Sequence, residues 1–345
     1  MGKALLAACP ATQKNDGRET SIMNVYHLVH SYPDHKIGPK HSRRMNMPLM
    51  QRRQALALGA VAGILPTIGA SAVAATPAST SGTKVPVRTR PIVIRDVEIG
   101  AGRTKTIVSL IEMTPDAVLS RARLLGSMGE VDVVEYRIDF LDRALDPQVV
   151  AATMRPVADA IKGKPLVVTF RTKAEGGQKA IAPAQYAAVY QAILQTGAGD
   201  LFDIEAALLS DPAVAALRTS VQAAGRKVIL SHHDFAVTPS VELMVGLLRQ
   251  QQALGADICK LAVMPHDTGD LLRLLEATWI MRRDHGDRPL VTMAMGGIGA
   301  VSRLAGEAFG SALSFGALGD PSAPGQVKVA QLRDTLAIVH DAIAG

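Results

Sequence analysis

A lysine lies inside a strongly apolar run, ADICKLAVM at residues 256–264. Burying an ammonium group is expensive, so burial there would favour the neutral amine. A neutral amine is a nucleophile that can attack a carbonyl carbon and form a Schiff base. The alternative is that Lys260 stands at a strand end and reaches solvent. The lysine alone does not decide between the two interpretations.

A histidine pair, His232-His233, lies in SHHDF, in the apolar run that precedes the one with Lys260. Imidazole can move protons near neutral pH, so one of these rings could serve as a general base beside the lysine. A structural histidine is the alternative. Side chains alternate along a strand, so only one of the pair can face inward. We expect His233 to face the site and His232 to point away from it.

Further charged residues follow other apolar runs. Glu135 and Arg137 in VVEYRID share one face by their spacing, with Asp139 next on that face. They could satisfy each other or hold a polyhydroxylated substrate. Arg171 and Glu175 lie in FRTKAEGG, where the Gly-Gly turn would let a loop bend tightly over a site. An ordinary solvated loop is the alternative for this segment.

Polar residues near the C-terminus complete the candidate set. Arg303 lies in SRLAGEAFGS, and its guanidinium fork suits a carboxylate. Ser322 and Gln326 lie in PSAPGQ, where Pro and Gly would fix a loop. The sequence has no HExxH, CxxC or P-loop and no carboxylates at metal-ligand spacing, so we expect no metal and no cofactor.

The elements that must position these residues alternate along the chain. Eight short β-like runs recur at roughly 25–35 residues with helical stretches between them, which is the size of a βα unit. The runs are 106–111, 131–138, 165–171, 201–208, 227–235, 256–264, 289–296 and 313–319. This pattern predicts an α/β fold, a (β/α)8 TIM barrel over 87–345 preceded by a β-hairpin in 87–100. A doubly wound sheet is the alternative, but no Gly-rich turn follows the first strand.

The N-terminal segments resemble an export leader. Residues 1–44 are polar and lack periodicity, so we expect an unstructured preamble, with the true start possible at a later methionine. Residues 45–75 carry Arg52-Arg53, a weakly apolar stretch and a small-residue A-x-A pattern, as in a twin-arginine signal peptide. Residues 76–86 form a linker. We expect a cleaved signal and a periplasmic enzyme; a membrane anchor and a cytoplasmic location are the alternatives.

The charge distribution excludes one class of partner. Nine Lys/Arg and only three Asp/Glu lie in residues 1–75, so this segment carries the whole net charge of +6 and residues 76–345 are neutral. Aromatic residues make up 3% of the chain. A neutral, aromatic-poor domain gives no reason to expect nucleic acid or a membrane surface as partner. Cys259 should lie on the opposite strand face from Lys260, as a core residue.

Taken in order, EYRID, FRxxxEGG, HHDF, ADICK, SRLAGExFGS and SAPGQ resemble the type I 3-dehydroquinate dehydratases over about residues 90–343. The resemblance implies a (β/α)8 lyase, as a rule a homodimer, that dehydrates 3-dehydroquinate without metal or cofactor. It implies Lys260 as the Schiff-base lysine, His233 as general base and acid, and Glu175 as the carboxylate paired with it. For substrate contacts it implies Arg303 at the carboxylate and Ser322 and Gln326 in a closing loop. It implies that Glu135, Arg137 and Arg171 hold the substrate hydroxyls and order the charges, and that Ser109, Met293 and Met295 are lesser wall positions.

Three features depart from the family pattern. His232 stands where Asn or a similar small residue is expected, Gly296-Gly297 stand where a bulkier residue is expected, and an export leader is unusual for a biosynthetic enzyme. The leader suggests quinate or shikimate breakdown outside the cytoplasm in place of aromatic amino-acid biosynthesis by the shikimate pathway. A class I aldolase is the alternative enzyme, although no Gly-rich phosphate site follows the last strands. An exported binding protein that has lost turnover is the alternative outside enzymes.

Overall fold

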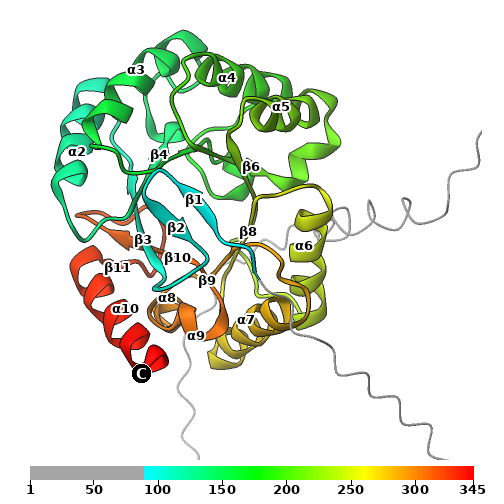
Figure 1. The fold of residues 1–345 in the computed structure, drawn as a ribbon. Coiled ribbons are helices and arrows are strands. Elements are labelled where there is room, and N and C mark those ends of the chain that lie inside the picture. The colour runs from blue at the N-terminus through cyan, green and yellow to red at the C-terminus, as the bar shows by residue number, and fades with distance from the viewer. Residues whose placement is uncertain (1–88) are drawn as a thin grey trace, which may run out of the picture. The chain divides into compact units, whose positions relative to one another are not determined.

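The computed structural model describes residues 89–345, in which eight parallel strands curl into a closed barrel (Figure 1). They run in the order β10-β3-β4-β5-β6-β7-β8-β9, and a bridge between Leu290 and Ser311 joins β9 back to β10. The strands are β3 (Lys105–Leu110), β4 (Val133–Arg137), β5 (Leu166–Thr169), β6 (Leu201–Glu205), β7 (Lys227–Asp234), β8 (Ile258–Val263), β9 (Leu290–Ala294) and β10 (Leu313–Ala317). Seven of the eight predicted β runs contain one of these strands, and β3 starts one residue before its predicted run of 106–111, so the predicted barrel is confirmed.

Helices between the strands form an outer ring (Figure 1). They are α2 (Pro115–Ser127), α3 (Pro147–Ala160), α4 (Pro183–Gln195), α5 (Pro212–Ala223), α6 (Val241–Ala253), α7 (Thr268–Ile280), α8 (Ala300–Leu304), α9 (Gly306–Phe309) and α10 (Val329–Ala344). Proline opens four of them, where its missing N–H costs no helical hydrogen bond. Side chains of Thr114, Asp146, Asp211, Ser240 and Asp267 accept bonds from the first free backbone N–H groups.

A β-hairpin precedes the barrel, as predicted. Its strands β1 (Ile92–Ile94) and β2 (Val97–Ile99) pair antiparallel and cross the centre of the barrel in projection (Figure 1). Ile94 and Ile99 belong to one apolar cluster with the first inward side chain of each barrel strand, such as Ile107 and Ile258. The hairpin therefore closes the N-terminal end of the barrel, which leaves the C-terminal end for chemistry.

Alternation along the strands divides the core into two clusters. Outward side chains such as Tyr136, Leu230 and Cys259 pack against the helices. Inward side chains form an apolar floor at the N-terminal end, and two residues farther along the strands the interior turns polar at Glu135, Lys260 and their neighbours. Cys259 is buried on the outer side, as expected from the period of two.

Several short elements had no sequence signal. A two-residue strand, β11 (Val327–Lys328), adds to β10 in parallel. Short 3₁₀ turns η1 (Ile138–Phe140), η2 (Lys173–Glu175) and η3 (Ala206–Ser210) follow β4, β5 and β6, and a π-helical turn η4 (Met281–His285) extends α7. Of these, η2 matters most for function because it ends in Glu175.

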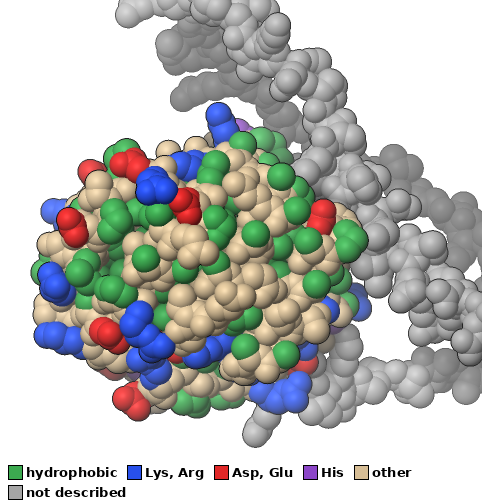
Figure 2. Space-filling view, turned by 90° about the horizontal axis from the view of Figure 1, so that it is seen from above, with side chains coloured by type: hydrophobic (Ala, Val, Ile, Leu, Met, Phe, Trp, Pro, Cys, Tyr) green, Lys and Arg blue, Asp and Glu red, His purple; other side chains and the backbone are tan. Residues whose placement is uncertain are grey.

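The surface of the described part carries charges of both signs. On the face in Figure 2, Lys and Arg side chains lie interspersed with Asp and Glu, without one broad field of either sign. Within residues 89–345, no helix has the length and apolar character needed to cross a bilayer. The expected preamble, signal peptide and linker at 1–86 lie outside the described residues.

Candidate active site

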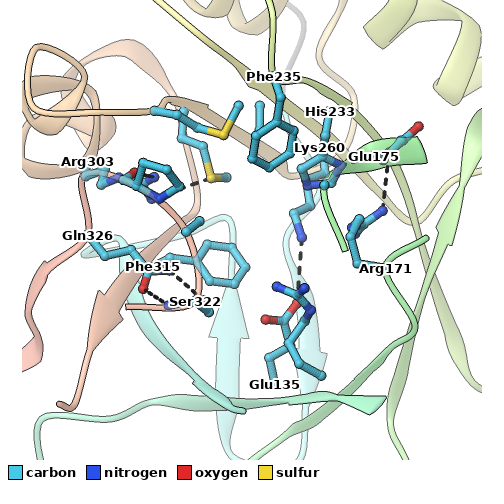
Figure 3. Close-up of a pocket in the computed structure, with 17 residues that line it drawn as sticks. Glu135, Arg171, Glu175, His233, Phe235, Lys260, Arg303, Phe315, Ser322 and Gln326 are labelled. Carbon is cyan, nitrogen blue, oxygen red and sulfur yellow. Dashed lines mark hydrogen bonds and ion pairs between the residues drawn. The ribbon is translucent and has the colours of Figure 1, made fainter. Parts of the chain in front are cut away.

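Lys260 lies near the middle of β8 with its side chain directed into the barrel, only 4% exposed. Its Nζ donates to Oδ2 of Asp203 at 2.7 Å and lies 3.8 Å from Oε1 of Glu135. The ring of Phe315 lies 4.7 Å from the same nitrogen. The lysine is therefore buried, as predicted, and does not reach solvent. It is not isolated, because the carboxylates of Asp203 from β6 and Glu135 from β4 face it; Figure 3 shows Glu135 beside the lysine.

Arg171, at the end of β5, is the cation around which these carboxylates are arranged. Its Nη2 donates to Asp203 at 2.8 Å, and its Nη1 donates to Glu205 at 3.0 Å and to Glu175 at 3.3 Å. Burial alone would raise the pKa of Asp203, but Arg171 and Lys260 lower it well below its ordinary value. Asp203 is thus an anion across the neutral pH range, held between Arg171 and Lys260.

Glu205 has the opposite electrostatic behaviour. Burial and the nearby charge of Glu175 raise its pKa to about 7, although Arg171 and the N–H and hydroxyl of Thr172 oppose the shift. Near neutral pH this side chain is therefore divided between its two protonation states, and the cluster can hold one extra proton without losing Asp203 as an anion.

His233 and Glu175 form the second part of the site. Nδ1 of His233 lies 2.9 Å from Oε2 of Glu175, which η2 carries from the β5–α4 loop. Gly176 follows at φ +83°, where a side chain would clash with Phe235. This turn brings Glu175 down onto β7. Because an ionised carboxylate can only accept a hydrogen bond, Nδ1 of His233 carries the proton and donates it to Glu175, and Nε2 keeps its lone pair.

The protonation states of this pair suit proton transfer. Burial, Arg171 and Lys260 lower the pKa of His233 to about 3, so its imidazole is neutral at pH 7. Burial would raise the pKa of Glu175, but hydrogen bonding to His232 and His233 overcomes this and lowers it to about 2. A neutral imidazole held by an ionised carboxylate is the arrangement of a general base.

His232 was expected to point away from the mouth, and it does not line the pocket. It is 1% exposed, and its Nδ1 lies 3.7 Å from Oε1 of Glu175. The two neighbouring histidines therefore face different oxygens of the Glu175 carboxylate, His232 facing Oε1 and His233 facing Oε2.

Arg303, on α8, stands on the opposite side of the pocket from Lys260 (Figure 3). Its guanidinium is 2% exposed and donates to the carbonyl of Pro324 at 3.2 Å and to the sulfur of Met293 at 3.6 Å. Burial lowers its pKa to about 10. Among residues 89–345, no carboxylate forms an ion pair with it, so this buried cation is poised for an anion from outside.

The loop after β10 forms one wall. Ser322 and Gln326 bond to each other twice, at 2.9 Å each, and Ser322 Oγ donates to Ser109 Oγ at 3.1 Å. Ser109 in turn donates to Glu135 at 2.5 Å. A hydrogen-bonded chain thus links the loop to a carboxylate beside Lys260. Ser109 acts in this chain and is not among the lining residues.

Glycines allow this loop to pack tightly. Gly325 has φ +80°, and a side chain there would come within 2.1 Å of the carbonyl oxygen of Gly296. The N–H of Gly296 donates to Pro324 at 3.2 Å. Gly296, at a position where the family pattern has a bulkier residue, has φ +68°, and its backbone forms the surface against which Gly325 packs.

The other expected substrate contacts fall into two groups. Arg137 lines the pocket, and its guanidinium makes a two-pronged ion pair with Asp139, 2.8 Å per bond. Met293 and Met295 also line it as apolar wall. All expected site residues except Ser109 therefore meet in one pocket (Figure 3). Within the described part of the chain, no three His, Cys, Asp or Glu side chains group as metal ligands.

The sequence interpretation missed the closest partner of Lys260. Asp203 and Glu205 lie two residues apart in LFDIEAAL, inside an otherwise apolar run. The spacing argument that selected Glu135 and Arg137 would have selected them too. Phe235 and Phe315, which line the pocket, were also missed; a single aromatic residue at a strand end carries no distinguishing signal.

Comparison with known proteins gives a consistent result. A family model described as type I 3-dehydroquinase matches residues 106–343. The 3-dehydroquinate dehydratases of Bacillus licheniformis and Bacillus subtilis are 42% and 40% identical, over 72% of this chain and 96% and 97% of theirs. A crystal structure of type I 3-dehydroquinate dehydratase from Clostridium difficile, with covalent modified comenic acid, is 37% identical with a TM-score of 0.70, over 74% of this chain and 99% of that one.

Proposed function

The chain belongs to the type I 3-dehydroquinase family, and from that premise we propose that Lys260 is the residue that binds 3-dehydroquinate as a Schiff base. The protein is a hydro-lyase, a 3-dehydroquinate dehydratase of the Schiff-base type. One observation carries the assignment of the lysine. Within the described residues, Lys260 is the only lysine that lines the pocket.

The reaction starts at the ketone carbon of the substrate. Lys260 first gives up one proton of its ammonium group within the site, and the free amine then attacks the ketone carbon. That proton and a second one from Nζ pass to the carbonyl oxygen, which leaves as water, and the third proton stays on the nitrogen of the protonated imine. The iminium withdraws electrons, so the C–H bond next to it becomes acidic. Asp203 lies 2.7 Å from the same nitrogen, where its negative charge stabilises the iminium.

Proton transfer is assigned to His233. Its Nε2 takes the proton from the carbon beside the iminium, which leaves an enamine and an imidazolium. Glu175, 2.9 Å from Nδ1, stabilises that imidazolium. The enamine nitrogen then re-forms the iminium, the enamine electrons form the new C=C bond, and the hydroxyl leaves with the C–O bonding pair. The imidazolium protonates the departing hydroxyl, so that it leaves as water. Water hydrolyses the iminium and frees 3-dehydroshikimate and Lys260.

Substrate orientation is assigned to the opposite wall. Arg303 binds the substrate carboxylate, because it is the buried cation without an ion-pair partner among residues 89–345. Ser322 and Gln326 close over the substrate, and Glu135 and Arg137 contact its hydroxyls. With the carboxylate fixed at Arg303, the ketone is held on the Lys260 side.

The test uses the absorbance of the conjugated product, which the saturated substrate lacks. Lys260→Ala should lower kcat by orders of magnitude while the substrate still binds by calorimetry. His233→Ala should slow imine formation and proton abstraction in single turnovers. Wild-type kcat in Lys260→Ala would refute the assignment.

Two broader properties extend the proposal. We propose a homodimer, supported by the family resemblance, and light scattering measures it directly. We also propose export to the periplasm and a role in quinate or shikimate breakdown, supported by the twin-arginine pattern and by the concentration of surplus positive charge in residues 1–75.

A further inference from the structure

The two neighbouring histidines of β7 contact the same carboxylate from different sides. His233 Nδ1 meets Oε2 of Glu175 at 2.9 Å, and His232 Nδ1 faces Oε1 at 3.7 Å. Arg171 approaches Oε2 at 3.3 Å, the oxygen that also serves His233. The remaining oxygen, Oε1, is buried and faces His232.

A buried carboxylate oxygen needs a donor to keep its orientation. Within residues 89–345, no donor lies at hydrogen-bond distance from Oε1, and the group that faces it is the His232 ring, with Nδ1 at 3.7 Å. If that oxygen turned toward a donor elsewhere, Oε2 would leave Nδ1 of His233, because both oxygens belong to one rigid group. The orientation of the catalytic imidazole therefore depends on what stands at position 232.

We propose that His232 is a positioning residue that holds Glu175 through Oε1, so that Oε2 stays on Nδ1 of His233 and Nε2 stays aimed at the substrate. This inference rests on the proposed function of His233. It assigns a role to the position at which this chain departs from the small polar residue expected in its family. His232 acts through Glu175 and does not touch the substrate, because it does not line the pocket.

The charged surroundings decide the sign of the effect on pH dependence. Glu175 is faced by Arg171 from β5, by Glu205 from β6 and by both histidines from β7. His233 is faced in addition by Lys260 from β8 and by the charge of Asp203. Without a donor from His232, the negative charge of Glu175 concentrates on Oε2. His233 then binds its proton more tightly, and the acid limb of kcat/KM moves to higher pH.

The experiment compares three full-length variants. His232→Leu fills similar space but carries no hydrogen-bond donor. His232→Asn keeps a donor in the same place, because the amide nitrogen of Asn, like Nδ1 of His, is bonded to Cγ. Leu230→Ala is the matched control, because Leu230 is buried in the outer apolar cluster on the same strand, two residues before His232, and does not line the pocket. We measure kcat, KM and the pH profile of each.

For His232→Leu we expect kcat to fall about tenfold, as for the loss of one polar contact to a charged group, with KM within about twofold of wild type. The acid limb should move to higher pH. His232→Asn should recover kcat to within about threefold. Leu230→Ala should lose stability and keep the wild-type profile. An unshifted or downward-shifted limb in His232→Leu, or equal kcat for Leu and Asn, would overturn the proposal.

A second measurement covers the case in which His232→Leu fails to fold. Nitrogen-15 NMR of the histidine rings in the wild-type enzyme should show a proton on Nδ1 of His232, and Glu175→Gln should shift that resonance. A ring protonated at Nε2 alone would overturn the proposal. Failure of His232 to act in this way leaves imine formation on Lys260 intact, so it is distinguishable from failure of the proposed function.

Discussion

Replacing Arg303 by Met should weaken substrate binding and at the same time stabilise the substrate-free enzyme. The guanidinium is 2% exposed, and no carboxylate of the described residues pairs with it. Burial lowers its pKa to about 10. The size of that fall corresponds to ~3 kcal/mol of lost solvation. Arg303 is thus a desolvated cation without a carboxylate partner among the described residues, and a substrate carboxylate would supply that partner.

The expected magnitudes follow from the contacts that change. Met removes the buried charge and keeps most of the volume, at the loss of the bond to Pro324, which is worth about 1 kcal/mol. The variant should therefore gain about 2 kcal/mol in free energy of unfolding, or roughly 4 °C or more in Tm. The substrate loses charged hydrogen bonds worth ~3 kcal/mol together, so kcat/KM should fall about 100-fold or more.

The assay combines urea unfolding of the substrate-free enzyme with steady-state kinetics. Arg303→Lys is the control, because it keeps the charge but loses the two-pronged geometry; it should show intermediate kcat/KM and no gain in stability. A substrate analogue without the carboxylate should lose affinity for the wild type and none further for Arg303→Met. The reasoning is wrong if the Met variant is less stable than wild type or keeps its kcat/KM within about threefold.

Three other predictions concern pH, metal and location. The pKa of His233 is lowered to about 3 in the folded state, so its contribution to the free energy of unfolding is lost as pH falls below its ordinary pKa of 6.5. The pKa of Glu205 is raised to about 7, so its contribution is lost as pH rises above its ordinary pKa of 4.5. The two contributions oppose each other between pH 4.5 and 6.5, so the free energy of unfolding of the wild type, measured with urea, should change little in this range. That of Glu205→Gln should fall steadily as pH falls, and parallel pH dependences for the two proteins would contradict this. EDTA should leave kcat unchanged, and a loss restored by zinc or magnesium would contradict a mechanism without metal. N-terminal sequencing of the periplasmic fraction should find a start near Ala75, and Arg52→Lys with Arg53→Lys should leave an active, uncleaved cytoplasmic enzyme; an intact 1–75 segment on the native cytoplasmic protein would refute export.

The fold was predictable because its signal is local and repeated. Each barrel strand is a short apolar run, and helical spacing separates it from the next. The barrel then restricts where chemistry can occur, so a lysine inside ADICKLAVM becomes informative. The seam between β9 and β10 and the added strand β11 were not predictable, because two hydrogen-bonded residues leave no periodic pattern.

The candidate site was predictable to the extent that single strands define it. Alternation placed Glu135, Lys260 and His233 on inward faces, but it says nothing of which residues meet across the barrel. Asp203 is 57 residues from Lys260 in sequence, and their 2.7 Å contact depends on how adjacent strands are staggered. His232 shows the limit most clearly. The period of two correctly turns it from the pocket, but a loop from β5 carries Glu175 across to meet it.

Reductive trapping tests the central claim most directly. The full-length enzyme is mixed with 3-dehydroquinate and sodium borohydride, digested, and mapped by mass spectrometry. The reduced imine should modify the peptide that contains Lys260 and no other lysine peptide, and the adduct should be absent from Lys260→Ala. An adduct on another lysine, or equal turnover with no adduct at all, would contradict the account.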